Sequence, residues 1–94
     1  MTDVFKALAD PTRRLILDEL ARREGQSLFE LCSLLLMQHG VESSRQAISQ
    51  HLAVLESVGL VTVQWHGRSK FHYFRPEPLE DITQRWLNPG EDTP

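Results

Sequence analysis

Arg45, Gln46, Ser49 and Gln50 share one face of a segment whose apolar spacing predicts a helix, since successive residues of a helix are about 100° apart. Arginine can form a bidentate pair with guanine O6 and N7, and glutamine can pair similarly with adenine N6 and N7. A helix face that only meets water more commonly carries glutamate and lysine pairs. The residue types therefore favour the reading of base edges, although a plain surface helix is the simpler alternative.

Other residues near this face suit contacts with phosphate. Ser44 stands where the helix begins, and a helix N-terminus attracts anions. His51 lies at the edge of the apolar face, where we expect it to be packed, with its exposed nitrogen available to a phosphate. Arg68 and Lys70 fall at the tip of a predicted hairpin, which suits the backbone beside the groove.

The distribution of charge separates this region from the rest of the chain. The 94 residues carry a net charge of −3, which taken alone argues against nucleic acid. Segment 43–75, however, holds four basic residues and one acidic residue, whereas the remainder holds six basic and twelve acidic residues. Such asymmetry matters more for the choice of partner than the total charge does.

Metal binding and catalysis find little support in the residue types. Cys32 is the single cysteine, which excludes an intrachain disulfide, and one thiolate cannot complete the ligand set of zinc or a soft metalloid. No two of the four histidines show ligand spacing, and no serine, histidine and aspartate grouping indicates a nucleophile. We expect a packed thiol, no metal, no cofactor and no enzymatic activity.

The elements that must position these residues follow from apolar periodicity and capping residues. Helices are predicted over 2–9, from Pro11 onwards, from Ser27 to about His39, and from Ser43 or Ser44 to about Ser57. Ser27 with Glu30, and Ser43 with Gln46, fit the capping box. Strands are predicted over 60–65 and 70–75, and a last helix follows Pro78. Residues 1–88 make one domain, and 89–94 form a polar tail.

Two registers are open for the hairpin. A two-residue turn at Gly67 and Arg68 pairs Trp65 with Lys70. A loop centred on Arg68 instead pairs Trp65 with Phe71, gathers the aromatic rings on one face and turns His72 to the polar face. We favour the second register.

Two helices joined by a short turn and followed by a hairpin form a winged helix-turn-helix, a mainly α fold. This fold suits DNA binding, because the major groove is about 12 Å wide and admits one helix. The first and last helices carry more apolar side chains than so small a core can use, which predicts a dimer interface. These side chains are Val4, Phe5, Leu8, Leu79, Ile82, Trp86 and Leu87.

Over about residues 5–75 the sequence resembles the ArsR-type family of bacterial winged-helix repressors. The resemblance lies in ALADPTRRLILDEL, SRQAISQHLAVLESVGLV and GRSKFHYF, and PEPLEDITQRWL resembles the last helix of metal-independent members. It implies a homodimer on an imperfect palindrome, paired through the first and last helices. The base-reading positions of the family fall on Arg45, Gln46, Ser49 and Gln50, and its phosphate contact falls on Ser44.

The family's metal sites are not reproduced. Its third-helix site needs Cys-x-Cys followed by aspartate, and here Ser33 and Leu34 follow Cys32. Its last-helix site needs aspartate and histidine, and here Glu80 and Asp81 stand without histidine. The resemblance thus implies a metal-independent subtype with a small organic effector or none.

We therefore predict a cytoplasmic, sequence-specific DNA-binding regulator, most simply a homodimeric repressor. The sequence begins without a basic signal-peptide region, and no apolar run is long enough for a membrane span. The main alternative is a winged-helix module that binds proteins and not DNA. The acidic net charge favours that alternative, and the Arg45, Gln46, Ser49 and Gln50 face opposes it.

Overall fold

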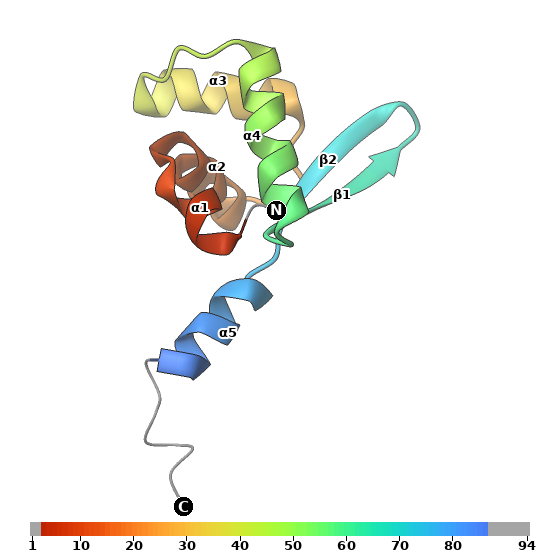
Figure 1. Cartoon of the computed structure of the whole chain (residues 1–94). Coiled ribbons are helices and arrows are strands. Elements are labelled where there is room, and N and C mark those ends of the chain that lie inside the picture. The colour runs from red at the N-terminus through yellow and green to blue at the C-terminus, as the bar shows by residue number, and fades with distance from the viewer. Residues whose placement is uncertain (1–2, 87–94) are drawn as a thin grey trace, which may run out of the picture.

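The computed structural model describes residues 3–86 and has the element order of a winged helix-turn-helix (Figure 1). The elements are α1 (Val4–Ala9), α2 (Pro11–Arg22), α3 (Leu28–His39), α4 (Arg45–Ser57), β1 (Val61–His66), β2 (Ser69–Phe74) and α5 (Glu77–Trp86). Leu87 and the predicted tail 89–94 lie outside the described residues. Within the described part, no helix is long and apolar enough to cross a membrane.

The predicted capping residues set the start of α2 and both ends of α3, whereas α5 begins at Glu77, before the predicted Pro78. The Asp10 carboxylate accepts hydrogen bonds from the backbone N–H groups of Thr12 at 2.8 Å and Arg13 at 3.1 Å, which starts α2. Ser27 and Glu30 form the predicted capping box of α3. Gly40 ends α3 with a φ of 66°, a left-handed conformation that glycine adopts without steric cost.

The start of α4 corrects one prediction. Ser44, rather than Ser43, is the N-cap, and its hydroxyl accepts a hydrogen bond from the Ala47 backbone N–H at 3.0 Å. The expected capping box of Ser43 with Gln46 does not form, and the residue three positions after Ser44 is Ala47, whose methyl group cannot complete such a box. The Gln46 side chain lies on the exposed face of the helix.

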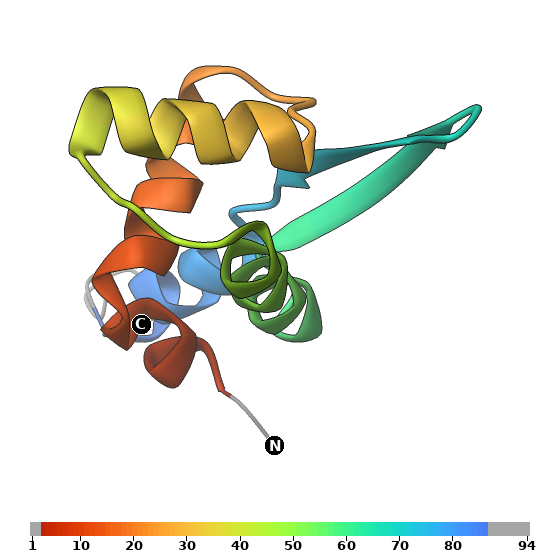
Figure 2. The ribbon, with the colours of Figure 1, turned by 90° about the horizontal axis from the view of Figure 1, so that it is seen from above.

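The core is a contiguous apolar cluster shared by α1–α4 and the entry to β1. It consists of Ala7, Ile16, Leu17, Leu20, Leu31, Leu35, Ile48, Leu52, Leu55, Leu60 and Val61. In Figure 1, α4 stands beside α1 and α2, α3 crosses its upper end, and the hairpin leaves from its lower end. Figure 2 shows the hairpin projecting well beyond the helices. The hairpin thus forms a wing beside α4.

The hairpin register is the one that we did not favour. Trp65 pairs with Lys70 and His66 with Ser69, so Gly67 and Arg68 form a two-residue turn. Gly67 has a φ of 63°, which a tight hairpin turn requires and glycine supplies readily. The preference for clustered aromatic rings was wrong because the conformational fit of Gly67 to this turn decides the register.

His72 is accordingly buried and does not lie on a polar face. Only 3% of its surface is exposed. Its backbone N–H donates to the Gln26 carbonyl at 2.9 Å, and its own carbonyl accepts from the Gly25 N–H at 2.9 Å. The ring Nδ1 lies 2.8 Å from the same Gln26 carbonyl, so Nδ1 must carry the proton there. These bonds fasten the wing to the loop between α2 and α3.

Candidate nucleic-acid interface

The outer face of α4 holds all four residues predicted to read bases. Arg45, Gln46, Ser49 and Gln50 are exposed, while the opposite face of α4 is buried in the core. Within residues 3–86, none of these four side chains forms a hydrogen bond or ion pair inside the protein. Their donors and acceptors are therefore free to meet an external partner.

The N-terminus of α4 is suited to an anion. The Ser44 hydroxyl oxygen already accepts a bond from the Ala47 N–H, so its hydrogen remains available to donate. The first turn of α4 carries no acidic residue. The positive end of the helix dipole is thus not compensated within that turn, which favours a phosphate group.

His51 is held by the junction between α1 and α2. Arg13 lies with Nη1 3.2 Å from His51 Nδ1, while its Nε donates to the Ala7 carbonyl at 2.7 Å. Because a guanidinium can only donate, Nδ1 must accept, and the proton of a neutral ring then resides on Nε2. His51 is half-buried, as predicted, and retains one donor.

Asp10 completes this junction. Desolvation raises the pKa of its carboxyl, but the hydrogen bonds from the Arg13 and Thr12 backbone N–H groups help to bring that pKa below its ordinary value. The carboxylate is therefore ionised near neutral pH and holds the start of α2. The junction fixes α1 against α2 and, through His51, against α4.

The two predicted wing cations have different surroundings. Arg68 is exposed in the turn between β1 and β2. Lys70 Nζ lies 4.0 Å from a Glu56 carboxylate oxygen and 5.8 Å from the centre of the Trp65 ring. Arg68 is thus the freer charge, whereas Lys70 is partly engaged with α4.

Trp65 is an exposed wing residue that the sequence reasoning did not single out. The side chain remains 64% exposed, and its ring lies beneath the Lys70 ammonium group. The favoured register had placed it in an aromatic cluster with Phe71. Correct weighting of the Gly67–Arg68 turn would have put Trp65 opposite Lys70 on the open face of the wing.

Of the residues predicted to form a dimer interface, Phe5 of α1 and Trp86 of α5 are in contact. The rings of Phe5 and Trp86 stack with their centres 5.6 Å apart, and they are 53% and 54% exposed. Val4, Leu8, Leu79 and Ile82 are half-buried. Apolar side chains of α1 and α5 therefore remain partly uncovered. Figure 1 shows α5 at the end of the molecule opposite α3.

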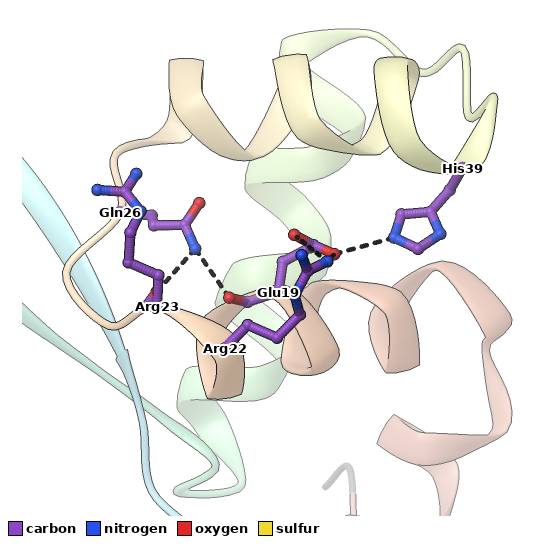
Figure 3. Close-up of polar contacts among 5 residues, drawn as sticks. All are labelled: Glu19, Arg22, Arg23, Gln26 and His39. Atoms are coloured by element: carbon purple, nitrogen blue, oxygen red, sulfur yellow. Dashed lines mark hydrogen bonds and ion pairs between the residues drawn. The ribbon is translucent and has the colours of Figure 1, made fainter.

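The sequence did not predict a polar cluster between α2, the loop that follows it and the end of α3. The Glu19 carboxylate is 3% exposed and lies 3.0 Å from both Arg22 Nη1 and His39 Nε2 (Figure 3). Gln26 Nε2 donates to the carbonyls of Glu19 at 2.8 Å and Arg23 at 2.7 Å. The cluster ties α2 to the end of α3. Local sequence spacing does not indicate it, because the partners lie up to twenty residues apart.

Cys32 lies half-buried on α3. Desolvation raises the pKa of its thiol above the ordinary value, and the nearby positive charge of Arg45 offsets part of that rise. Across residues 3–86, no group of three or more histidine, cysteine, aspartate or glutamate side chains is arranged to hold a metal ion.

Comparisons with known proteins agree with this architecture. A helix-turn-helix domain family model matches residues 8–64. The chain is 45% identical to the uncharacterized HTH-type transcriptional regulator YuzN of Bacillus subtilis, covering 89% of this chain and 91% of that protein. It is 36% identical to the arsenic resistance transcriptional regulator ArsR1 of Pseudomonas putida, covering 92% and 70%. An ArsR-like transcriptional regulator structure from Rhodococcus superposes with a TM-score of 0.77 at 34% identity, covering 95% and 75%.

Proposed function

Because this chain belongs to the ArsR-type family of winged helix-turn-helix transcriptional regulators, we propose that it is a homodimeric repressor that reads a palindromic operator through α4. The observation that carries the proposal is the exposed face of Arg45, Gln46, Ser49 and Gln50, whose side chains have no partner among residues 3–86. Side chains of these types read base edges in the major groove. The proposed function is regulatory rather than catalytic.

The phosphate contacts are assigned to four residues around this face. Ser44 and the α4 N-terminus would bind one phosphate, and the Nε2 donor of His51 would bind another. Arg68 would follow the DNA backbone beside the groove, with Lys70 in a supporting role because Glu56 already faces it. Residues 1–88 are proposed as one DNA-binding and dimerisation domain.

Selection of duplexes from a random pool by the purified protein, followed by sequencing, tests this proposal. In a twofold dimer each α4 meets one half-site, so we expect two inverted half-sites whose centres are about 10 base pairs apart. A pool that remains random after several rounds would contradict sequence-specific reading.

A protein-interaction module is the alternative function. The net charge of −3 and the exposed side chains of Phe29 and Met37 favour it. The two functions differ in their response to salt, because contacts with phosphate release counterions and contacts with a protein surface do not. A titration of random duplex DNA at several salt concentrations separates them.

Independence of metal ions is part of the proposal. Cys32 would have to bind zinc or arsenite without a second thiolate, and one thiolate is too few ligands for either. We expect stoichiometric zinc or arsenite to leave operator affinity unchanged. A metal response of the wild-type protein that disappears in Cys32→Ser would overturn this part.

A further inference from the structure

A cavity of about 430 Å³ lies between α3 and the loop that leads into α4. Its lining residues are Phe29, Cys32, Ser33, Leu36, Val41, Glu42, Ser43 and Arg45. The volume falls in the range of sites for small organic molecules. The cavity is therefore lined both by α3 and by Arg45, the first residue of α4.

One side of the cavity is formed by apolar side chains that are largely exposed to water. Phe29 and Leu36 lie seven residues apart on the same side of α3 and are 65% and 49% exposed. Val41 adds a half-buried aliphatic side chain from the loop. Large apolar side chains that line a cavity are favourable partners for the apolar body of a ligand, because binding removes their surface from water.

The other side of the cavity ends at a positive charge without an internal partner. Within residues 3–86, Arg45 forms neither a hydrogen bond nor an ion pair. Its positive charge is close enough to Cys32 to offset part of the rise in the pKa of that thiol. The first turn of α4 adds no acidic residue. Glu42 is the one carboxylate among the lining residues, and it would repel an anion that came near it.

We propose that this cavity binds a small carboxylic acid with an apolar body, whose carboxylate pairs with the Arg45 guanidinium while Phe29, Leu36 and Val41 cover the body. A planar guanidinium matches a carboxylate with two parallel hydrogen bonds. The regulatory consequence rests on the proposed function, in which Arg45 also reads a base. A carboxylate that occupies Arg45 would compete with DNA, and the acid would release the operator.

The binding step is tested without DNA. Naphthoate and octanoate are titrated into the isotope-labelled full-length chain and followed by amide NMR, with naphthalenemethanol as the uncharged analogue. We expect saturable shifts centred on residues 29–45 with at least one of the two acids, and at least tenfold weaker binding of the alcohol. Absence of saturable shifts with both acids, or equal binding of the alcohol, would overturn the proposal.

Variants locate the two ends of the ligand. Arg45→Gln should weaken the acid at least tenfold, and Glu42→Gln should strengthen it, because it removes the like charge. A loss of affinity for the acids in Glu42→Gln would show that Glu42 does not repel the bound carboxylate, and would contradict the placement of that carboxylate in this cavity. Phe29→Ala should weaken binding severalfold, whereas Met37→Ala, a change at a 79% exposed α3 residue outside the lining, should not.

The effect on DNA is measured separately. If the acid and DNA exclude each other, an acid concentration of ten times its dissociation constant should weaken operator binding by about tenfold for each chain. Acid binding without any operator binding would refute the proposed function and leave the cavity assignment intact. Operator binding that depends on Arg45, without acid binding, would refute the cavity assignment alone.

Discussion

Arg45 and Gln50 are expected to read sequence rather than to anchor the protein. Both side chains are exposed on α4 and lack partners within residues 3–86, so their removal disturbs little of the fold. Arg45→Ala and Gln50→Ala should each cost roughly 1–3 kcal/mol on the cognate duplex and relax the base preference at one position. Fluorescence anisotropy on cognate and single-substituted duplexes measures both effects.

Arg68 serves as the contrasting cation, because it is exposed in the wing turn and does not belong to the exposed face of α4. Arg68→Ala should weaken cognate and random DNA alike and lower the salt slope by about 1 for each phosphate that the variant no longer neutralises. A weakening confined to the cognate duplex in Arg68→Ala, or a pure salt-slope change in Arg45→Ala, would reverse the two assignments.

Glu30 gives a prediction on pH. The Ser27 N–H bond, followed by the Arg23 side-chain bond, holds the pKa of its carboxyl below the ordinary value for glutamate. A carboxyl whose pKa is lower in the folded state stabilises the protein above its unfolded-state pKa, and this stabilisation disappears as pH falls through the folded-state pKa.

We therefore expect Glu30→Gln to be less stable than wild type near neutral pH by less than about 1 kcal/mol, because the pair is partly exposed. The difference should shrink as pH falls below the unfolded-state pKa of glutamate, about 4.3, and vanish once pH is below the lower folded-state pKa. Urea unfolding at a series of pH values measures it. A difference that stays constant with pH would mean that the charge of Glu30 contributes nothing and only its shape matters.

At the scale of elements, local chemistry predicts the helices well. Asp10–Pro11, Ser27 with Glu30, and Gly40 act through bonds to backbone groups a few residues away, so the sequence alone reveals them. The wing was harder to predict. Its register depends on the fit of Gly67 to a tight turn and on the pairing of His72 with Gln26, a residue 46 positions away. Long-range pairing of this kind leaves no local pattern.

The same distinction between local pattern and long-range packing applies to the candidate site. The exposed face of α4 follows from helical periodicity, and the sequence therefore located Arg45, Gln46, Ser49 and Gln50 together. The contacts of His51 with Arg13 and of Lys70 with Glu56 depend on how elements pack against each other. The cavity beside Arg45 likewise depends on the path of the loop after Gly40, which periodicity does not describe.

The fastening of the wing can be tested with two histidines of the same hairpin. His72→Ala removes a buried ring and the Nδ1 donor to the Gln26 carbonyl, which should cost about 2–4 kcal/mol of unfolding free energy. His66→Ala changes an exposed ring and should cost no more than about 0.5 kcal/mol. Equal costs in urea unfolding would mean that the wing is not held through His72.

At the scale of the whole molecule, we expect a twofold dimer through α1 and α5. The stacked Phe5 and Trp86 rings are each about half exposed, and burying them against a second copy is favourable. Light scattering should give the mass of two chains at micromolar concentration. Trp86→Ser should shift the protein toward the monomer, with Trp65→Ser, on the similarly exposed wing, as the control. A wild-type monomer would contradict the interface.

In the proposed dimer, dimerisation and DNA reading are linked, because two copies of α4 would face two half-sites at once. An acidic chain with one basic region gains little from general attraction to DNA. Most of its affinity for an operator should therefore come from contacts made by α4 and the wing, and non-specific binding should be weak.

A salt titration of the wild-type protein on a selected duplex and on a random duplex tests base reading through α4 most directly. We predict that the selected duplex binds at least about a thousandfold more tightly near physiological salt, with both affinities falling as salt rises. Equal affinity for the two duplexes at every salt concentration would contradict sequence-specific reading by Arg45, Gln46, Ser49 and Gln50.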